Sequence, residues 1–384
     1  MMIELLLWTA ALVSLALAAH PFVTYPLSLM ALRKSAVPRA TPSAAPPTFT
    51  ICMCAYNEER VIEQKAQNLL ALKAREPSLQ ILIYVDAASD RTAEILQAYA
   101  QHFEIHVARE RRGKTHGMNL LAVRATGSVL VFTDANVLLD EHCLDNLRRD
   151  FADREIGCVC GNLIYTNGTD SVTASPGSLY WRLEERIKLL EQRSGSVMGA
   201  DGSLFAVRRS LHCAPPDHII DDMFVSFMVL IQGYRIVQST NAQAYEASAS
   251  SSAEEFHRKS RIACQAFNVH RLIWPAIRQL DALTVYKYVS HKLLRWLSIY
   301  FLAAAALFGL AAVVAGGYLG LATGLVVLGV ALIALGLRGS IKPLSQTVDV
   351  LTSLAGAGLG VWQSLRGESY QTWTPVASVR RAGD

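Results

Sequence analysis

The sequence predicts an α/β protein, a mostly parallel sheet with helices on both faces, flanked by transmembrane and interfacial helices. Apolar segments lie at both ends of the 384-residue chain, in which 52% of the residues are hydrophobic and the mean hydropathy is +0.25. Between them, short apolar strands alternate with amphipathic helices, the pattern of a parallel sheet. Polar residues follow several strands directly, at the edge where such sheets bind ligands.

Residues 1–35 are expected to form a transmembrane anchor. Residues 3–32 are almost uncharged, which is enough for one span of about 20 residues, and Pro21 and Pro26 mark a kink or an interfacial end. A cleaved signal peptide is the alternative, because Ala16-Leu-Ala18 resembles a cleavage site, but no Lys or Arg precedes the apolar stretch. Positive charges follow it, which places the next segment in the cytoplasm.

The central part of the chain carries the α/β pattern. Residues 36–47, rich in Pro, Ser, Thr and Ala, form a predicted linker, and residues 48–253 form the predicted sheet domain. Its strands are expected at residues 48–54, 79–85, 105–107, 204–207 and 234–237, and in the apolar run that begins at Val129. Its helices are expected at residues 58–74, 91–103, 115–125, 178–192 and 221–230.

The C-terminal part returns to membrane-type sequence. Residues 254–296 alternate basic and aromatic residues, which predicts amphipathic helices at a membrane interface. Within 297–365, two apolar segments predict a transmembrane hairpin near 297–316 and 320–337, and basic residues after it favour a cytoplasmic return. The third segment, 344–365, either spans or lies flat against the others. Residues 366–384 are expected to form a cytoplasmic tail.

The net charge and the cysteines indicate the kind of partner and the redox compartment of the protein. The net charge of +4 is mild, and the basic residues lie near the apolar segments. This favours membrane lipids over nucleic acid as a partner. The seven cysteines contain no C-x-x-C pair, so we expect small buried side chains in a reducing compartment.

Two stretches suggest a metal and a phosphate site. The strand that begins at Val129 ends in Asp134 and Asn136, whose oxygen atoms suit Mg²⁺ or Mn²⁺ when phosphates complete the shell. A solvated turn is the alternative. Arg111-Arg-Gly-Lys114 places cations beside a glycine at a helix start, which suits phosphate, although it could also be plain basic surface.

Polar loops also follow the first two strands. Ala55-Tyr-Asn-Glu58 could hold a base or ribose, or Asn57 could simply cap the next helix. After the second strand, Asp86 could accept hydrogen bonds from a base or ribose, while Asp90 is expected to cap a helix.

Two later motifs suggest a base and an anion clamp. Asp221-Asp222 could provide a general base, with an acidic helix cap as the alternative. Arg258 and Arg261 lie on one helical face and could bind a pyrophosphate, or could face the membrane.

In this order, the motifs resemble the membrane-bound inverting glycosyltransferases of family 2, which have a GT-A fold. That family includes the synthases of cellulose, chitin, hyaluronan and poly-N-acetylglucosamine. The resemblance covers roughly residues 48–275 and the membrane layout on both sides. It also includes the Gly199-x-x-Gly202 motif.

The resemblance implies a role for each motif. Nucleotide contacts would come from Ala55, Tyr56, Glu58, Asp86 and Lys114. Asp134 and Asn136 would hold Mg²⁺ or Mn²⁺ on the diphosphate, and Arg258 and Arg261 would bind the pyrophosphate. Asp222, beside Asp221, would be the catalytic base. Gly199, Asp201 and Gly202 would lie at the donor or acceptor sugar.

Two departures from the family pattern matter. Asn136 replaces the second acid of the D-x-D motif. Arg258-Lys-Ser-Arg-Ile262 has Arg for Gln and Ile for Trp in the Q-x-x-R-W motif, which argues against processive polymerisation.

The sequence therefore predicts sugar transfer from a nucleotide sugar, with UDP-sugar favoured, to a lipid-linked or polysaccharide acceptor. The enzyme would be integral to the cytoplasmic (inner) membrane, with its catalytic domain in the cytoplasm. A polyprenyl-phosphate sugar transferase and an inactive membrane scaffold are the alternatives. A Rossmann dehydrogenase is disfavoured, because no G-x-G-x-x-G follows the first strand.

Overall fold

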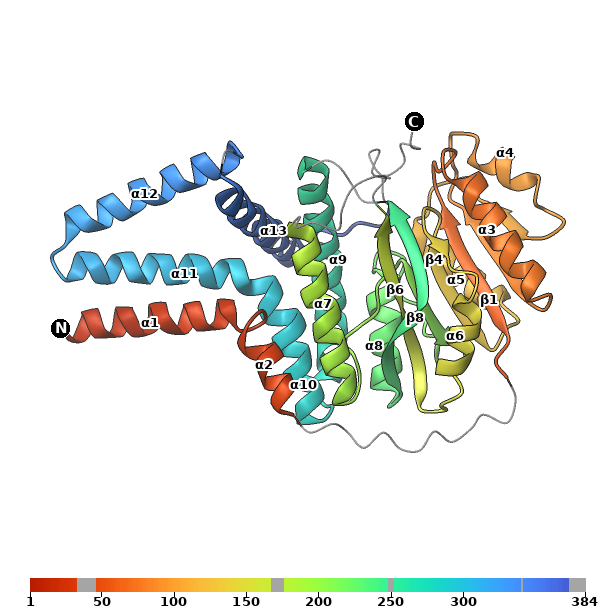
Figure 1. Ribbon diagram of the computed structural model, residues 1–384, viewed down its shortest axis with the longest axis horizontal. Helices are drawn as coiled ribbons and strands as arrows, with labels where there is room; N and C mark the ends of the chain where they lie inside the picture. The colour runs from red at the N-terminus through yellow and green to blue at the C-terminus, as the bar shows by residue number, and fades with distance from the viewer. Residues whose placement is uncertain (33–45, 167–175, 248–251, 340, 373–384) are drawn as a thin grey trace.

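The computed structural model describes residues 1–32, 46–166, 176–247, 252–339 and 341–372. Most of the predicted linker and the tail beyond residue 372 lie outside these ranges. Figure 1 shows a mixed sheet with its covering helices at one end and a group of long apolar helices at the other. A layer of helices that includes α7 (Pro176–Arg193) and α9 (Ser252–Ile277) lies between them.

One sheet organises the described part of the chain, with the strand order β3-β2-β1-β4-β7-β6-β8-β5. The strands are β1 Phe49–Ala55, β2 Gln80–Val85, β3 Glu104–Val107, β4 Val129–Asp134, β5 Leu138–Leu139, β6 Ile156–Thr166, β7 Leu204–Arg208 and β8 Arg235–Ala247. The pairs β1–β2, β1–β4, β2–β3 and β6–β8 are parallel, whereas the three others are antiparallel. The α/β prediction is confirmed, and the sheet is mixed because β7 runs against both of its neighbours.

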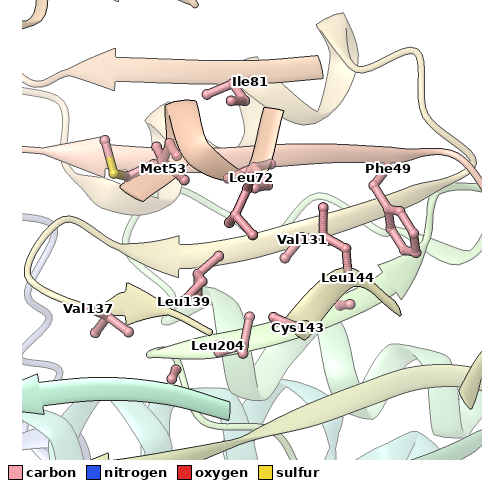
Figure 2. Packing of buried hydrophobic residues seen from close by; sticks show 14 of the residues in the cluster. Phe49, Met53, Leu72, Ile81, Val131, Val137, Leu139, Cys143, Leu144 and Leu204 are labelled. Atoms are coloured by element: carbon pink, nitrogen blue, oxygen red, sulfur yellow. The ribbon is translucent and has the colours of Figure 1, made fainter. Parts of the chain in front are cut away.

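Strand β1 separates two apolar layers. All seven of its residues are buried, as expected for a strand covered on both faces. Phe49 and Met53 pack in one layer with helix residues such as Leu72, as Figure 2 shows. Cys52 and Cys54 point into the opposite layer. All seven cysteines are free thiols and six are buried, as the sequence predicted.

Helices cover both faces of the sheet. The first layer packs against α3 (Ile62–Arg75), α4 (Thr92–Gln97) and α6 (Cys143–Asp150). The second packs against α5 (Lys114–Arg124), α8 (Asp221–Ile231) and α9. Helix α4 is shorter than predicted, because turns replace the helix from residue 98 onward.

Strand β6 was missed by the sequence analysis, and its glycines explain why. A Cβ atom at Gly157 would lie 2.5 Å from the Val229 side chain, and one at Gly161 would lie 2.4 Å from Leu204. Glycine weakens a strand pattern, but here it permits close packing. The sequence analysis also missed α6 and β5, and it ended β8 ten residues too early.

In the described part of the chain, three apolar segments are long enough to cross a membrane: Met2–Ala19, Ala282–Ala315 and Leu319–Leu337. Helix α1 (Met2–Ala19) lies beside α11 (Leu294–Ala315), and α11 and α12 (Leu319–Leu337) form the predicted hairpin (Figure 1). The chain turns near Pro21 before the short helix α2 (Thr24–Ala31), in agreement with the predicted kink.

The third C-terminal segment forms α13 (Lys342–Leu365), which does not belong to the three candidate spans found in the described ranges. It packs along α9 at very short range. A Cβ atom at Gly360 would lie only 2.3 Å from the Ser260 carbonyl oxygen, so only glycine fits there. This contact fixes the end of α13 against the helix that carries Arg258 and Arg261.

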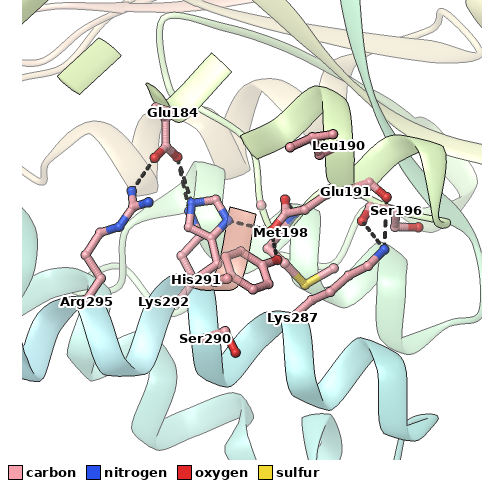
Figure 3. A network of polar contacts seen from close by, with 12 residues as sticks. Glu184, Leu190, Glu191, Ser196, Met198, Lys287, Ser290, His291, Lys292 and Arg295 are labelled. Atoms are coloured by element: carbon pink, nitrogen blue, oxygen red, sulfur yellow. Dashed lines mark hydrogen bonds and ion pairs between the residues drawn. The ribbon is translucent and has the colours of Figure 1, made fainter. Parts of the chain in front are cut away.

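The junction between the sheet domain and the apolar helices contains buried charges. Glu184 and Glu191 of α7 face His291 and Arg295, which lie where α10 (Ala282–Tyr288) continues into α11. Residues Val289–Leu293 form a π-helical turn, and Figure 3 shows His291 pointing from it toward α7. We call Glu184, Glu191, Lys287, His291 and Arg295 the junction network.

Candidate active site

The parallel strands bring the predicted motifs together. Strands β1, β2 and β4 run in the same direction, so Tyr56, Asp86 and Asp134 all lie at one edge of the sheet. Helices α5 and α8 begin at the same edge with Lys114 and Asp221. The strand ends of a parallel sheet are where a ligand crevice forms.

Asp86 holds the loop that precedes α5. It is completely buried, and its Oδ1 accepts a hydrogen bond from the Arg112 amide at 2.8 Å. Its Oδ2 accepts one from the Gly113 amide at 3.1 Å and lies 3.7 Å from Arg111 Nε. In the structure Asp86 therefore shapes the Arg111–Lys114 loop. Its contact with a nucleotide base or ribose stays a prediction.

The loop after β1 lies beside this basic loop. The Arg111 guanidinium stacks on the Tyr56 ring, 3.6 Å from its centre, in a cation–π contact. Ala55 and Glu58 are buried, and the Glu58 amide donates a hydrogen bond to Thr92 Oγ1 at 2.7 Å. Asn57 does not cap α3, which begins at Ile62; it adopts a φ of 53° and accepts a bond from the Ser89 amide.

Lys114 lies at the centre of an acidic cluster. Its Nζ is 2.7 Å from Asp134 Oδ1 and 4.0 Å from Asp221 Oδ1. A Cβ atom at Gly202 would lie 2.9 Å from Asp222 Oδ2 and 3.3 Å from Lys114 Nζ. The glycine therefore leaves room at the point where the lysine and the carboxylates converge.

The charge states of this cluster are shifted in ways that suit catalysis. Burial, and then the neighbouring Asp221 carboxylate, raise the pKa of Asp222 to about 7. Burial lowers the pKa of Lys114, but Asp134, Asp221 and Asp222 outweigh it and raise that pKa above its usual value. Lys114 thus stays charged, while Asp222 can exchange a proton near neutral pH.

The donor atoms of this cluster fit a divalent cation on a diphosphate. The Lys114 ammonium group forms an ion pair with Asp134, at a position that a metal cation could also occupy. The buried Asp221 Oδ2 has no hydrogen-bond partner. In the described ranges, no three His, Cys, Asp or Glu side chains form a complete ligand set. This agrees with Mg²⁺ chemistry, in which one or two carboxylates act together with substrate phosphates.

Helix α9 brings the two predicted arginines to the same region. Burial, and then the neighbouring Arg258, lower the pKa of Arg261, whereas the charges of Tyr370 and Asp134 oppose this shift. Arg258 hydrogen-bonds Tyr165, at the end of β6. Both arginines are half-buried, so they do not form an exposed basic patch.

The Gly199–Gly202 loop connects this cluster to α7. Asp201 forms an ion pair with Lys188 of α7. Gly199 adopts a φ of +93°, and a Cβ atom there would lie 3.2 Å from the Phe227 ring. The predicted sugar-site residue Gly202 therefore lies beside Lys114 and Asp222, and its neighbour Asp201 is paired with α7.

Several residues that neighbour the predicted motifs were not among the predicted site residues. Gln371 Nε2 donates a hydrogen bond to the Arg112 carbonyl at 3.1 Å, so the segment after α13 covers the basic loop. Tyr165 and Glu246 lie at the ends of β6 and β8, where they neighbour Arg258 and Asn136. The sequence carries no motif that would have identified them.

Comparisons with known proteins show which family this chain is similar to. Residues 50–213 match the family model for glycosyl transferase family 2. Poly-β-1,6-N-acetyl-D-glucosamine synthase from Staphylococcus aureus strain COL is 27% identical over 198 residues, which cover 49% of this chain and 47% of that enzyme. The Staphylococcus epidermidis enzyme is 23% identical over 195 residues, with the same coverage. The chain thus spans about half the length of the curated relatives it matches.

A solved structure extends the similarity to nearly the whole chain. A mannosyltransferase from Pyrobaculum calidifontis, in complex with GDP-mannose and Mn²⁺, has a TM-score of 0.70 at 23% identity. The match covers 94% of this chain and 99% of the mannosyltransferase. At this identity the likeness concerns the fold.

Proposed function

We propose that the region matching the family 2 model, residues 50–213, belongs to a glycosyltransferase domain, and that the whole protein transfers a sugar from a nucleotide-sugar donor to a polysaccharide or lipid-linked acceptor at a membrane surface. The observation that carries this proposal is the convergence of Lys114, Asp134 and the Asp221-Asp222 pair at one sheet edge. It joins a cationic group for the leaving diphosphate to a carboxylate that can accept a proton.

The leaving group is a nucleoside diphosphate, whose negative charge grows as the bond to the sugar breaks. Lys114, Arg258 and Arg261 stabilise that charge, because charged donors bind phosphate oxygens strongly. Asp134, together with Asn136, would hold Mg²⁺ or Mn²⁺, which would supply further positive charge at the diphosphate. The Arg111–Lys114 loop and Tyr56 would bind the nucleotide beside it.

Asp222 acts as the general base of the proposed reaction. Its pKa of about 7 allows it to take the proton of an acceptor hydroxyl at neutral pH. The acceptor oxygen then forms a bond to the anomeric carbon from the face opposite the diphosphate, and the bond to the diphosphate breaks. One displacement of this kind inverts the anomeric configuration.

The acceptor would reach the site from the membrane side. Three apolar helices of the described ranges lie at one end of the molecule (Figure 1). Asp201, in the Gly199–Gly202 loop, pairs with Lys188 of α7, and α7 lies between the sheet and those helices. The basic residues after the first apolar segment support a cytoplasmic catalytic domain in the inner membrane. The relatives synthesise an N-acetylglucosamine polymer and the structural neighbour binds GDP-mannose, so UDP-N-acetylglucosamine and GDP-mannose are the first donors to test.

The test uses the full chain in lipid nanodiscs with a panel of UDP- and GDP-sugars, Mg²⁺ or Mn²⁺, and extracted membrane lipids. We expect one donor to release nucleotide and the labelled sugar to appear in a saccharide or glycolipid product. A sugar linked directly to a lipid phosphate would instead identify a polyprenyl-phosphate transferase. Nucleotide release no greater than that of the Asp222→Asn variant would reject the enzymatic function and favour the membrane scaffold.

A further inference from the structure

We propose that Glu246 supplies the second carboxylate of the metal–diphosphate site, in the place of the acid that position 136 lacks. This inference rests on the proposed function. It makes Glu246 a positioning residue that acts through Asn136. The carboxylate would set the orientation of the Asn136 amide and add the negative charge that a D-x-D motif carries at its second position.

Strand pairing brings the two residues together across 110 positions of sequence. The short strand β5 pairs antiparallel with β8, with Leu138 opposite Tyr245. Asn136 lies two residues before Leu138, and Glu246 follows Tyr245. As a result, Asn136 Nδ2 donates a hydrogen bond to Glu246 Oε1 at 2.9 Å.

This bond fixes which end of the Asn136 amide faces Glu246. A carboxylate only accepts hydrogen bonds, so the amide must direct its NH₂ group toward Glu246. Its Oδ1 atom, the one that can bind a hard cation, then lies at the other end of the planar group. Partners of this kind orient metal ligands and raise metal affinity, with losses of about 10- to 100-fold when they are removed.

The surroundings of Glu246 place its charge beside the diphosphate-binding arginines. Glu246 pairs in register with Tyr165 across β6 and β8. Burial, and then the charge of Glu246, raise the pKa of the Tyr165 hydroxyl, whereas Arg258, to which it is hydrogen-bonded, lowers it. Glu246 therefore lies between the metal-binding turn at Asn136 and the arginine on α9, where a second acidic charge would act on a cation.

A charge relocated from position 136 to position 246 can be tested by moving it back. In Glu246→Gln the side chain keeps its size but loses its charge. In the double variant Asn136→Asp/Glu246→Gln the two groups are exchanged, because the carboxylate introduced at position 136 can accept the hydrogen bond that the new glutamine amide donates. Glu155→Gln is the matched control, since Glu155 is exposed at the opposite end of the β6–β8 pair.

The measurement is Mn²⁺ affinity of the full chain with UDP or GDP present, followed by the electron paramagnetic resonance of free Mn²⁺, which needs no turnover. We expect about a 10-fold or greater loss for Glu246→Gln, no change for Glu155→Gln, and recovery close to wild type for the double variant. Nucleotide affinity without Mn²⁺ and the thermal unfolding temperature should stay the same in all four proteins.

Two results would each overturn this inference and leave the proposed function intact. They are wild-type Mn²⁺ affinity in Glu246→Gln and a lack of recovery in the double variant. A parallel loss of Mn²⁺ affinity and folding stability would also overturn it, because it would show a purely structural role. If the wild-type chain fails to bind Mn²⁺ in the presence of either nucleotide, both this inference and the proposed function fail.

Discussion

The molecule contains two buried charged regions that differ in how their carboxylates are neutralised. In the active-site cluster, Lys114 faces the carboxylates of Asp134, Asp221 and Asp222. In the junction network, Glu184 pairs with Arg295 and His291, and Glu191 pairs with His291, while Lys287 donates to the Glu191 backbone carbonyl (Figure 3). The first region has three carboxylates around one lysine, whereas in the second each carboxylate has a histidine or arginine partner.

The pKa shifts follow this difference. Burial raises the pKa of Asp222, and the adjacent Asp221 adds to the shift. Burial acts in the same direction on Glu184, but Arg295 and His291 outweigh it and hold the pKa of Glu184 well below its usual value. Burial acts in the same direction on both carboxyl groups, so the charges of their neighbours decide whether the pKa ends above or below its usual value.

Both carboxylate oxygens of Glu191 accept hydrogen bonds in the junction network. Its Oε1 accepts hydrogen bonds from the Tyr25 hydroxyl at 2.5 Å and from His291 Nδ1 at 2.6 Å. Its Oε2 accepts one from the Met198 amide at 2.9 Å. By contrast, Asp221 Oδ2 is buried without a partner. The junction network joins α2, α7 and the start of α11, whereas the cluster around Lys114 contains a carboxylate oxygen without a hydrogen-bond partner.

The same chemical change in the two regions should have opposite consequences. Asp222→Asn removes the proposed base, so we expect the transfer rate to fall by about 10³-fold. Donor affinity should change little, and the unfolding temperature should stay equal or rise, because one of two adjacent acids becomes neutral. Radiolabelled sugar transfer, calorimetry with the nucleotide and thermal unfolding measure these three quantities. A rate near that of the wild type would exclude Asp222 as the base.

In the junction network, Glu191→Gln should instead reduce stability by about 2 kcal/mol, because one amide oxygen cannot accept all the hydrogen bonds that Tyr25, His291 and the Met198 amide donate to the carboxylate. Nucleotide affinity of the folded protein should remain unchanged. Thermal unfolding in detergent measures the effect, with Glu94→Gln as the control at the exposed Arg91–Glu94 pair. An unchanged unfolding temperature for Glu191→Gln would mean that the network does not hold the junction.

The raised pKa of Asp222 predicts the pH dependence of catalysis. The base must be ionised, so kcat/KM should rise with pH and level off above about pH 7. Below that pH it should fall by up to about 10-fold per unit. Initial rates across this pH range test the prediction, with wild-type unfolding measured in the same buffers. A flat profile on both sides of neutral pH would contradict the assignment of Asp222.

The sequence predicted the part of the site that local pattern determines. Asp134 follows a continuous apolar strand, and Asp222 opens an apolar helix, so both could be located from their neighbours alone. Glu246 could not, because its contact with Asn136 depends on the register between β5 and β8. Strand β5 has only two residues, too few to show the alternation of apolar and polar residues that predicts a strand.

The junction network was equally hidden from sequence analysis. His291 reaches Glu184 and Glu191 from a π-helical turn, which changes the direction of side chains that ordinary helical spacing would predict. The fold class and the first strands were predictable because β1, β2 and β4 are short, apolar and separated by amphipathic helices. Contacts between elements that are far apart in the sequence depend on how those elements pack, which cannot be predicted from a short motif.

Lys65 provides a third, smaller test of how partners control a buried charge. It lies on α3 beneath the Asp134 turn, completely buried, and its Nζ donates to the Val137 carbonyl and to Thr133 Oγ1. These partners are neutral, unlike the carboxylates around Lys114. Burial lowers the pKa of Lys65 to about 7, although Asp134 opposes the shift.

The sign of the resulting pH effect follows from proton binding. An unfolded lysine has a pKa of about 10.4, so between about pH 7 and pH 10 the unfolded chain binds more protons than the folded one. The contribution of Lys65 to stability therefore rises with pH in this window, by at most about 1.4 kcal/mol per unit. Lys65→Met should lack this contribution, so its unfolding temperature relative to wild type should fall as the pH is raised through this window. Lys73→Met on the same helix is the control, and a constant difference between wild type and Lys65→Met would mean that Lys65 remains charged throughout.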